Sequence, residues 1–133
     1  MLPALLVAPV LVAPVLVAGS CAAWHGQVVG QYPGVVESQG PKRIDTWITL
    51  DPDDRLSGRY VLHEPTRDVP GTLQAVGDDG CDAALFRWTD LYGTGLVRLQ
   101  FQPADHCFDG AWGLMQLNPA LEWHTCFRAP VTS

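Results

Sequence analysis

The chain has 133 residues, with 14 acidic and 8 basic side chains and a formal net charge of -6 at pH 7. Nucleic-acid binding needs a basic surface, so this balance argues against a nucleic-acid partner, and 47% hydrophobic with 17% charged residues excludes a disordered chain. The length allows one domain, and the 13 glycines and 11 prolines disfavour long helices.

The N-terminal stretch is uncharged and apolar. Residues 1–36 contain no Asp, Glu, Lys or Arg, and residues 5–18 are almost wholly Leu, Val, Ala and Pro. Such a stretch, followed by small residues, is typical of a secretory signal peptide. It is shorter than the roughly 20 residues that span a bilayer, and Pro9 and Pro14 interrupt its helix. We predict a signal peptide over residues 1–20 and a single β-barrel domain over 21–133, with a retained anchor as the alternative.

Small residues lead from this stretch to a cysteine, in the order Val-Ala-Gly-Ser-Cys over residues 17–21. The segment resembles a bacterial lipobox, in which a small residue precedes a cysteine that is acylated and becomes the mature N-terminus. The resemblance implies export and lipidation of Cys21, with membrane attachment through that N-terminal lipid only. The protein would then lie in the periplasm or cell envelope. An ordinary signal peptide, cut near residues 18–20 or 21–23, is the alternative and implies free secretion.

From Trp24 onward, short alternating runs are separated by Gly, Pro and Asp, a pattern typical of strands and turns. No window has the period of a long helix. The Pro33-Gly34 turn signal places residues 31–40 in a loop. We predict about eight strands, near residues 24–30, 43–50, 56–63, 71–76, 82–89, 95–101, 108–113 and 122–128.

Two hairpins repeat one pattern, in which a strand and a Pro/Asp turn lead to an apolar-x-Gly-x-aromatic strand. Alternation within each strand fixes which residues share a face. In each predicted register a glycine faces an aliphatic side chain, which indicates close approach or a bend of the kind that closes a sheet. The predicted pairs are Leu50–Leu56, Ile48–Gly58 and Thr46–Tyr60, then Phe101–Phe108, Leu99–Gly110 and Val97–Trp112, and Gly110–Trp123 in a third hairpin.

Eight short antiparallel strands in sequential hairpins fit a small closed barrel that side chains can fill. The predicted fold class is all-β, a small antiparallel up-and-down β-barrel, with a two-sheet β-sandwich as the alternative. In architecture and strand count the layout resembles the small up-and-down barrels of the lipocalin and avidin class.

The chain has four cysteines, which an export signal predicts to be oxidised. The register of the third hairpin brings Cys107 beside Cys126 on the outer face, so we predict a disulfide between them. Cys81 then pairs with Cys21 or, if Cys21 is acylated, stays free. The cysteine spacings suit no common zinc site, and we predict no metal.

The aromatic side chains predict either a filled barrel or a cavity for an apolar or ring-bearing ligand. Trp47 is the exception, because alternation places it on the outer face, where it would be a partner surface unless the 31–40 loop covers it. The inner-face set is Tyr60, Phe86, Trp88, Phe101, Phe108, Trp112, Trp123 and Phe127. Six of these are the predicted ligand contacts: Tyr60, Phe86, Trp88, Phe101, Trp112 and Trp123.

Motifs for catalysis are absent from the sequence, which has no Gly-x-Ser-x-Gly, no His-Glu-x-x-His and no phosphate loop. We therefore predict no catalytic residues, no cofactor and no enzyme. A barrel mouth with Asp90, Tyr92 and Asp105 is the one arrangement that would suit acid–base chemistry. Because the first and eighth strands of a barrel adjoin, we also expect His25 near His124.

Two functions fit these observations. The first is an exported, lipid-anchored small barrel that binds an apolar or aromatic small molecule in its interior, which requires a cavity. The alternative is an envelope protein-binding or enzyme-inhibitor module that acts through its outer face, including Trp47, and its loops.

Overall fold

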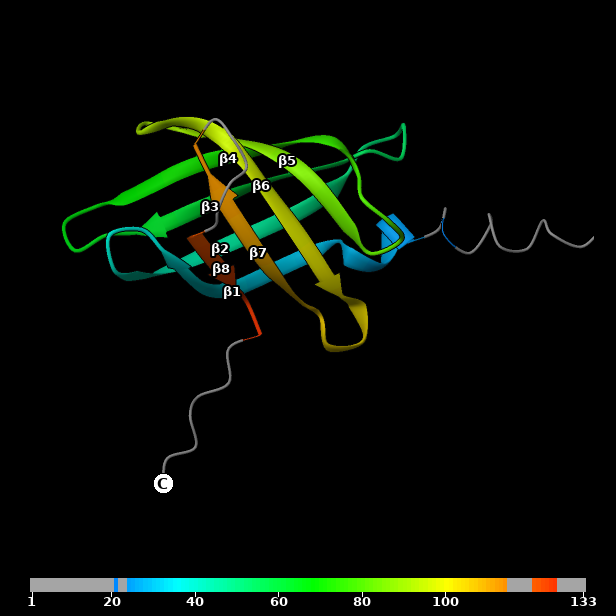
Figure 1. The fold of residues 1–133 in the computed structure, drawn as a ribbon, viewed down its shortest axis with the longest axis horizontal. Helices are drawn as coiled ribbons and strands as arrows, with labels where there is room; N and C mark the ends of the chain where they lie inside the picture. Colours follow the sequence, from blue (N-terminus) through cyan, green and yellow to red (C-terminus); the bar gives the residue numbers. More distant parts are fainter. Residues whose placement is uncertain (1–20, 22–23, 115–120, 127–133) are drawn as a thin grey trace, which may run out of the picture.

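The computed structural model describes Cys21, residues 24–114 and residues 121–126. Eight antiparallel strands form one closed barrel, in which each strand pairs with its neighbour in sequence and β1 pairs with β8 (Figure 1). The predicted up-and-down β-barrel is confirmed, and the sandwich alternative is wrong. The elements are η1 (Trp24–Val28), β1 (Gly30–Glu37), β2 (Pro41–Leu50), β3 (Leu56–His63), β4 (Asp68–Asp78), β5 (Ala83–Asp90), β6 (Gly93–Gln102), η2 (Pro103–Asp105), β7 (Cys107–Gly113) and β8 (Leu121–His124).

The first strand lies later in the chain than predicted. Residues 24–28 form the 3-10 helix η1, and β1 runs through the stretch predicted as a loop. Pro33 fits within β1 because β8 pairs only with Val35 and Val36 among the described residues, so the missing N–H of Pro33 breaks no ladder there. Gly34 is required for a different reason, since a Cβ at this position would collide with the main-chain oxygen of His124.

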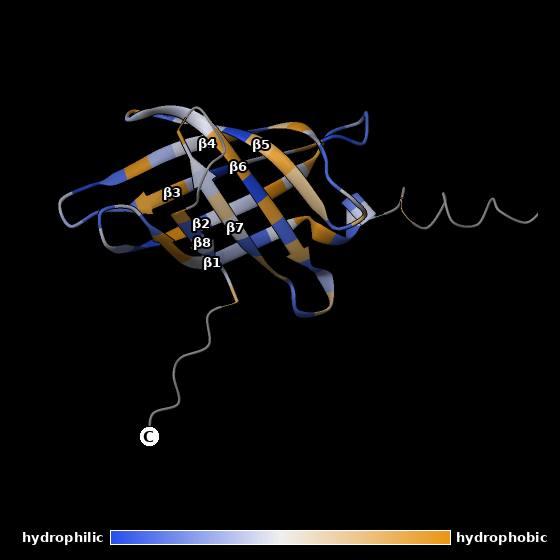
Figure 2. Cartoon of the chain, viewed as in Figure 1, coloured by the Kyte–Doolittle hydropathy of each residue, from blue (hydrophilic) through white to orange (hydrophobic). Residues whose placement is uncertain are grey.

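The predicted strand registers are confirmed. Gly58 lies opposite Ile48, and Gly110 lies between Leu99 and Trp123. A Cβ added at Gly58 would lie 3.2 Å from Ile48 Cδ1, and one at Gly110 would lie 2.8 Å from Leu99 Cδ2. An aliphatic side chain therefore occupies the space over each glycine, and apolar residues alternate with polar ones along the strands (Figure 2).

Two disulfides close the fold. Cys107 at the start of β7 is bonded to Cys126 just after β8, with a Cα–Cα distance of 5.0 Å, which confirms the predicted pair. Cys21 is bonded to Cys81 in the β4–β5 connection, 60 residues away. A disulfide sulfur cannot also carry an acyl-bearing thioether, so the structure corresponds to the non-acylated alternative for Cys21. Two disulfides indicate a protein from outside the cytoplasm.

The two ends of the barrel are closed differently. The helix η1 and the β2–β3, β4–β5 and β6–β7 connections lie together at one end, here called the closed end; the β1–β2, β3–β4 and β5–β6 connections lie at the other, the open end (Figure 1). Trp24 and Val28 of η1 are 4% and 0% exposed, so η1 plugs the closed end. Behind it, Phe101 packs against Trp24, Tyr32 and Phe108 with ring centroids 5.6–5.9 Å apart.

Candidate functional site

The open end of the barrel contains a pocket of about 400 Å³. Its walls come from six of the eight strands, from the β1–β2, β3–β4 and β5–β6 connections, and from Leu114 just after β7. Aromatic and aliphatic side chains make up most of the wall, and three charged residues share it. The aromatic residues are Tyr60, Trp88, Tyr92, Trp112 and Trp123; the larger aliphatic ones are Val36, Ile44, Leu62, Leu114 and Leu121; the charged ones are Lys42, Glu64 and Asp90.

The indole rings of Trp88 and Trp112 are held rigidly against the barrel wall. Trp88 Nε1 donates a hydrogen bond to the main-chain oxygen of Gly113 at 2.9 Å, and Trp112 Nε1 donates to that of Glu37 at 3.1 Å. The two rings pack edge to face, with centroids 5.5 Å apart and an angle of 88°. Both indole N–H groups are therefore satisfied by strand carbonyls.

Trp123 differs from the other two pocket tryptophans. Its side chain packs edge to face on Tyr60, with ring centroids 5.2 Å apart, and is only 3% exposed. Its Nε1 is buried and has no hydrogen-bond partner among the residues that the structure describes. A buried N–H without a partner is costly, so this side chain lowers the stability of the pocket wall.

Asp90 is held in the pocket by two hydrogen bonds. The Tyr60 hydroxyl donates to Asp90 Oδ2 at 2.6 Å, and the main-chain N–H of Tyr92 donates to Oδ1 at 2.8 Å. The Tyr60 ring can lie across β4 because Gly71, opposite it, has no Cβ to collide with the ring. Burial, and then the hydrogen bond to Asp90, raise the pKa of Tyr60, so its hydroxyl remains a donor at neutral pH.

Glu64, by contrast, lies in a compensated polar cluster on the rim. The Tyr92 hydroxyl donates to the Glu64 carboxylate at 2.7 Å, Arg67 Nε lies 3.5 Å from Oε1, and Lys42 Nζ lies 3.8 Å from Oε2. The hydrogen bond from Tyr92, together with the two cations, lowers the pKa of Glu64. Its negative charge is therefore matched within the protein.

Four of the six predicted ligand contacts line the pocket, namely Tyr60, Trp88, Trp112 and Trp123. Phe86 and Phe101 do not, because they lie deeper, within the packed core, at 0% and 1% exposure. Alternation along a strand shows which side chains point inward, but it does not show how far along the barrel axis each one lies. Phe127 lies outside the described residues.

The sequence prediction placed Asp90 and Tyr92 at a barrel mouth, as the structure has them, but it overlooked the charges of Lys42 and Glu64 in the pocket wall. In three strands, the inward-facing alternation reaches a charged residue two positions beyond the last apolar one. These pairs are Ile44 and Lys42, Leu62 and Glu64, and Trp88 and Asp90. An inward charge at the end of an apolar run conflicts with simple core packing and is the pattern expected of a functional position. All three lie at the same end of the barrel.

Two other predicted positions lie away from the pocket. Trp47 is on the outer face, as expected, but the guanidinium of Arg59 covers its ring, with Cζ 4.1 Å from the ring centroid. The predicted 31–40 loop is not what covers it, because those residues form β1 and the following turn. Asp105 belongs to η2 at the closed end, so it does not join Asp90 and Tyr92 at the mouth.

The expected approach of His25 to His124 is wrong, because His25 lies in η1 at the closed end. Its Nε2 contacts the Asp78 carboxylate at 2.9 Å, and its Nδ1 donates to the main-chain oxygen of Asp54 at 2.7 Å. Burial alone lowers the pKa of His25, but these two hydrogen bonds outweigh it and raise the pKa overall. The ring thereby ties η1 to the β2–β3 connection and to the end of β4.

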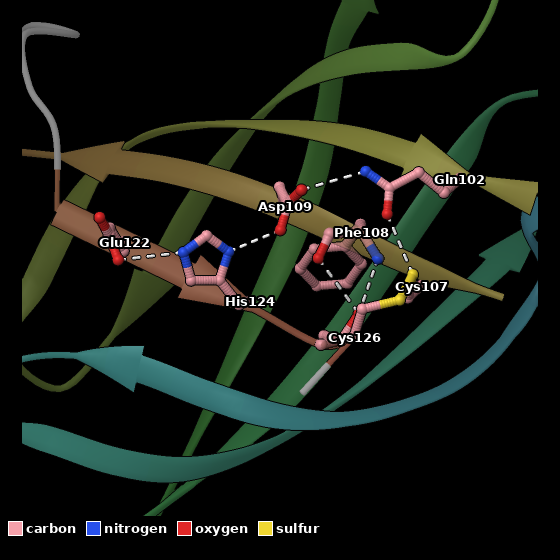
Figure 3. A network of polar contacts seen from close by, with 8 residues as sticks. Gln102, Cys107, Phe108, Asp109, Glu122, His124 and Cys126 are labelled. Carbon is pink, nitrogen blue, oxygen red and sulfur yellow. Dashed lines mark hydrogen bonds and ion pairs between the residues drawn. A yellow bond between two sulfur atoms is a disulfide. The ribbon is translucent and has the colours of Figure 1, made fainter. Parts of the chain in front are cut away.

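His124 belongs to a polar network on the outer face of β7 and β8 (Figure 3). Its ring lies between Asp109, at 2.6 Å, and Glu122, at 3.0 Å, while Gln102 Nε2 donates to the other Asp109 oxygen at 3.0 Å. Burial lowers the pKa of His124, and the two carboxylates more than reverse this effect. The network borders the Cys107–Cys126 disulfide and ties the last strand to β7.

The described part of the chain holds neither a cluster of metal ligands nor a membrane-spanning helix. Among residues 21, 24–114 and 121–126, no group of three or more His, Cys, Asp or Glu side chains is arranged to hold a metal ion. Over those residues, no helix has the length and apolar character needed to cross a bilayer.

Comparison with protein-family models, curated proteins and solved structures found no match.

Proposed function

We propose that this protein binds a small molecule with an apolar or aromatic part in the open-end pocket. The observation that carries the proposal is the pocket itself, about 400 Å³ with aromatic walls in a barrel whose other half is packed. Small-molecule sites are typically pre-formed, mostly apolar cavities of roughly 300–1,000 Å³ with a few polar groups that orient the ligand. Asp90 and the Glu64 cluster are such groups here.

The wall is suited to binding because it is already ordered. Trp88 and Trp112 are fixed by hydrogen bonds to main-chain oxygens, and Tyr60 is fixed by Asp90. A ligand would therefore lose little free energy to ordering these side chains on binding.

We also propose that the protein is exported and acts in the periplasm or cell envelope. The support is the apolar N-terminal stretch together with two disulfides, which form and persist in oxidising compartments. Acylation of Cys21 would attach it to the membrane by a lipid, and the Cys21–Cys81 disulfide is the competing state. In either state, Cys21 lies beside the closed end, so the pocket mouth faces away from that point.

The alternative, a module that binds an envelope protein through Trp47, has weaker support. Arg59 occupies one face of the Trp47 ring, so a partner would first have to displace that guanidinium. We therefore favour the pocket over the outer face.

The test is binding of N-phenyl-1-naphthylamine, a neutral aromatic probe whose fluorescence rises in apolar surroundings. We expect saturable binding at one site per chain and at least about tenfold weaker binding by Trp112→Leu, because that ring forms one wall. Trp47→Leu is the matched control and should bind as the wild type does. Absence of saturable binding, or equal loss in both variants, would refute the proposal.

A further inference from the structure

Asp90 is the one charged group in the pocket that lacks an opposite charge. Its two hydrogen bonds come from the neutral donors Tyr60 and Tyr92, and no Lys, Arg or His among the described residues lies within ion-pair distance of it. A carboxylate can accept about four hydrogen bonds, so acceptor capacity remains. Such a group within an apolar wall favours a positively charged partner.

The other charged groups in the wall do not compete for this role. Glu64 is matched by Lys42 and Arg67, and its oxygens accept the Tyr92 hydroxyl. Among the described residues of the wall, Lys42 is the only cationic side chain, and Glu64 is its partner. A bound anion would therefore have to break this pair, whereas a bound cation would leave it intact.

The aromatic surroundings also favour a cation. The faces of aromatic rings carry negative potential, and rings gathered around a cavity attract alkylated ammonium groups. The N–H edges of Trp88 and Trp112, which would repel a cation, are directed to the carbonyls of Gly113 and Glu37. The net charge of -6 adds a general attraction for cations.

From these contacts we propose that the pocket binds an organic cation, an amine or quaternary ammonium with apolar or aromatic substituents, with the positive charge at Asp90. This inference rests on the proposed function, since it names the ligand class of the same pocket. The apolar substituents pack on the tryptophan wall. A bare metal ion is a poor fit, because Asp90 offers a single carboxylate.

The test compares two probes of the same shape, phenyltrimethylammonium and tert-butylbenzene, which differ in having a charged nitrogen or a neutral carbon at the centre. Each is titrated against the full-length protein by displacement of N-phenyl-1-naphthylamine, with benzenesulfonate as an anionic third probe. We expect phenyltrimethylammonium to displace the dye at a concentration at least about tenfold lower than tert-butylbenzene does, and benzenesulfonate to be the weakest.

Asp90→Asn removes the charge while keeping an oxygen that can accept from Tyr60. In this variant, phenyltrimethylammonium and tert-butylbenzene should displace the dye at about the same concentration. The concentration needed for tert-butylbenzene should be the same as for the wild type. Asp105→Asn is the control, because it makes the same charge change at the closed end, and it should keep the preference. The wild-type comparison needs no variant, so the inference stays testable if Asp90→Asn fails to fold.

The outcomes separate the two proposals. Equal displacement by the cation and its neutral analogue would overturn the organic-cation inference and leave the pocket function standing. Stronger displacement by benzenesulfonate would overturn it in favour of Lys42. Failure of the dye itself to bind would refute the pocket function. A cation preference that survives Asp90→Asn, or is lost equally in Asp105→Asn, would remove Asp90 from its proposed role.

Discussion

The closed and open ends of the barrel share one alternation of inner and outer residues but fill their inner positions differently. At the closed end the inner residues are large and apolar, η1 adds Trp24 and Val28, and aromatic rings pack against one another. At the open end, the inward-facing positions along β2, β3 and β5 end in the charged residues Lys42, Glu64 and Asp90. A pocket remains between them. Several side chains there are also exposed, at 43–61%: Leu91, Tyr92, Leu114 and Leu121.

This difference indicates a division of labour. Burial of apolar surface at the closed end supplies stability, while charged groups and a cavity at the open end reduce local stability in exchange for a binding site. The strands run through both halves, so the packed half holds the walls of the pocket in place. Substitutions at the two ends should therefore have opposite effects on stability and binding.

The largest expected effect is on the closed end. Phe108→Ala removes a fully buried ring that contacts Phe101, Tyr32 and Trp123, and should reduce the free energy of unfolding by about 3–5 kcal/mol. Leu114→Ala, at the open end and 61% exposed, should change it by no more than about 0.5 kcal/mol. Urea unfolding measures both. Similar losses in the two variants would contradict a division between the ends.

The second largest expected effect comes from the Cys21–Cys81 disulfide at the closed end. In the chain-entropy model, the Cys21–Cys81 bond, 60 residues apart, contributes about 4 kcal/mol, and Cys107–Cys126, 19 apart, about 3 kcal/mol. Cys81→Ser should therefore destabilise the exported protein by several kcal/mol, as measured by urea unfolding without a reductant.

Acylation of Cys21 predicts a different result for the same variant. A lipid on the Cys21 sulfur leaves Cys81 without its partner, so Cys81→Ser would then leave stability almost unchanged. The mass of the exported protein provides an independent measurement. A chain lacking four hydrogens contains both disulfides, whereas a diacylglyceryl mass on a chain beginning at Cys21 indicates a lipoprotein.

The fold was predictable from the sequence because its determinants are local. Two-residue alternation fixed the inner face, and the turn residues fixed the registers that place Gly58 opposite Ile48 and Cys107 beside Cys126. The position of β1 was not predictable in this way, because Pro33 and Gly34 carry a turn signal. Within the described residues, only the short pairing of β1 with β8 and the close approach of His124 make them suitable for a strand.

The site was predictable only in part. Alternation correctly placed Trp88 and Trp112 on the inner face, but depth along the axis depends on the stagger of all eight strands, so Phe86 could not be separated from Trp88. Hydrogen bonds between side chains far apart in the sequence were likewise not predictable. The Tyr60–Asp90 bond joins β3 to β5, 30 residues later in the chain.

A smaller effect tests the boundary between the two halves. Thr46 is 0% exposed and faces inward between Tyr32 and Tyr60, and its hydroxyl has no hydrogen-bond partner within the described part of the chain. Thr46→Val should raise the free energy of unfolding by about 1 kcal/mol, because it removes an unpaired buried hydroxyl at nearly the same shape. Thr72→Val, on the exposed face of β4, controls for the strand preference of valine. A loss of stability in Thr46→Val would show that the hydroxyl has a partner.

The smallest effect is electrostatic and lies on the outer face toward the open end. His63 Nε2 lies 2.8 Å from Asp45 and Nδ1 lies 2.9 Å from Asp68, so the ring connects β2, β3 and β4. The hydrogen bond to Asp45, and then that to Asp68, raise the pKa of His63 above 6.5. A raised folded-state pKa means that the charged ring stabilises the fold fully below pH 6.5, and that this contribution is lost as pH rises through the raised value.

His63→Gln should therefore be less stable than the wild type by up to about 1 kcal/mol at pH 5.5, and the gap should shrink as the pH is raised to 8. Urea unfolding at several pH values measures the gap, and the NMR titration of the His63 ring measures the pKa itself. A gap that widens with pH would mean that the neutral ring is the favoured form. The two carboxylates lie outside the barrel, so ligand binding in the pocket should be the same in His63→Gln as in the wild type. Unchanged binding would show that this surface contact acts on stability alone and not on the open-end pocket.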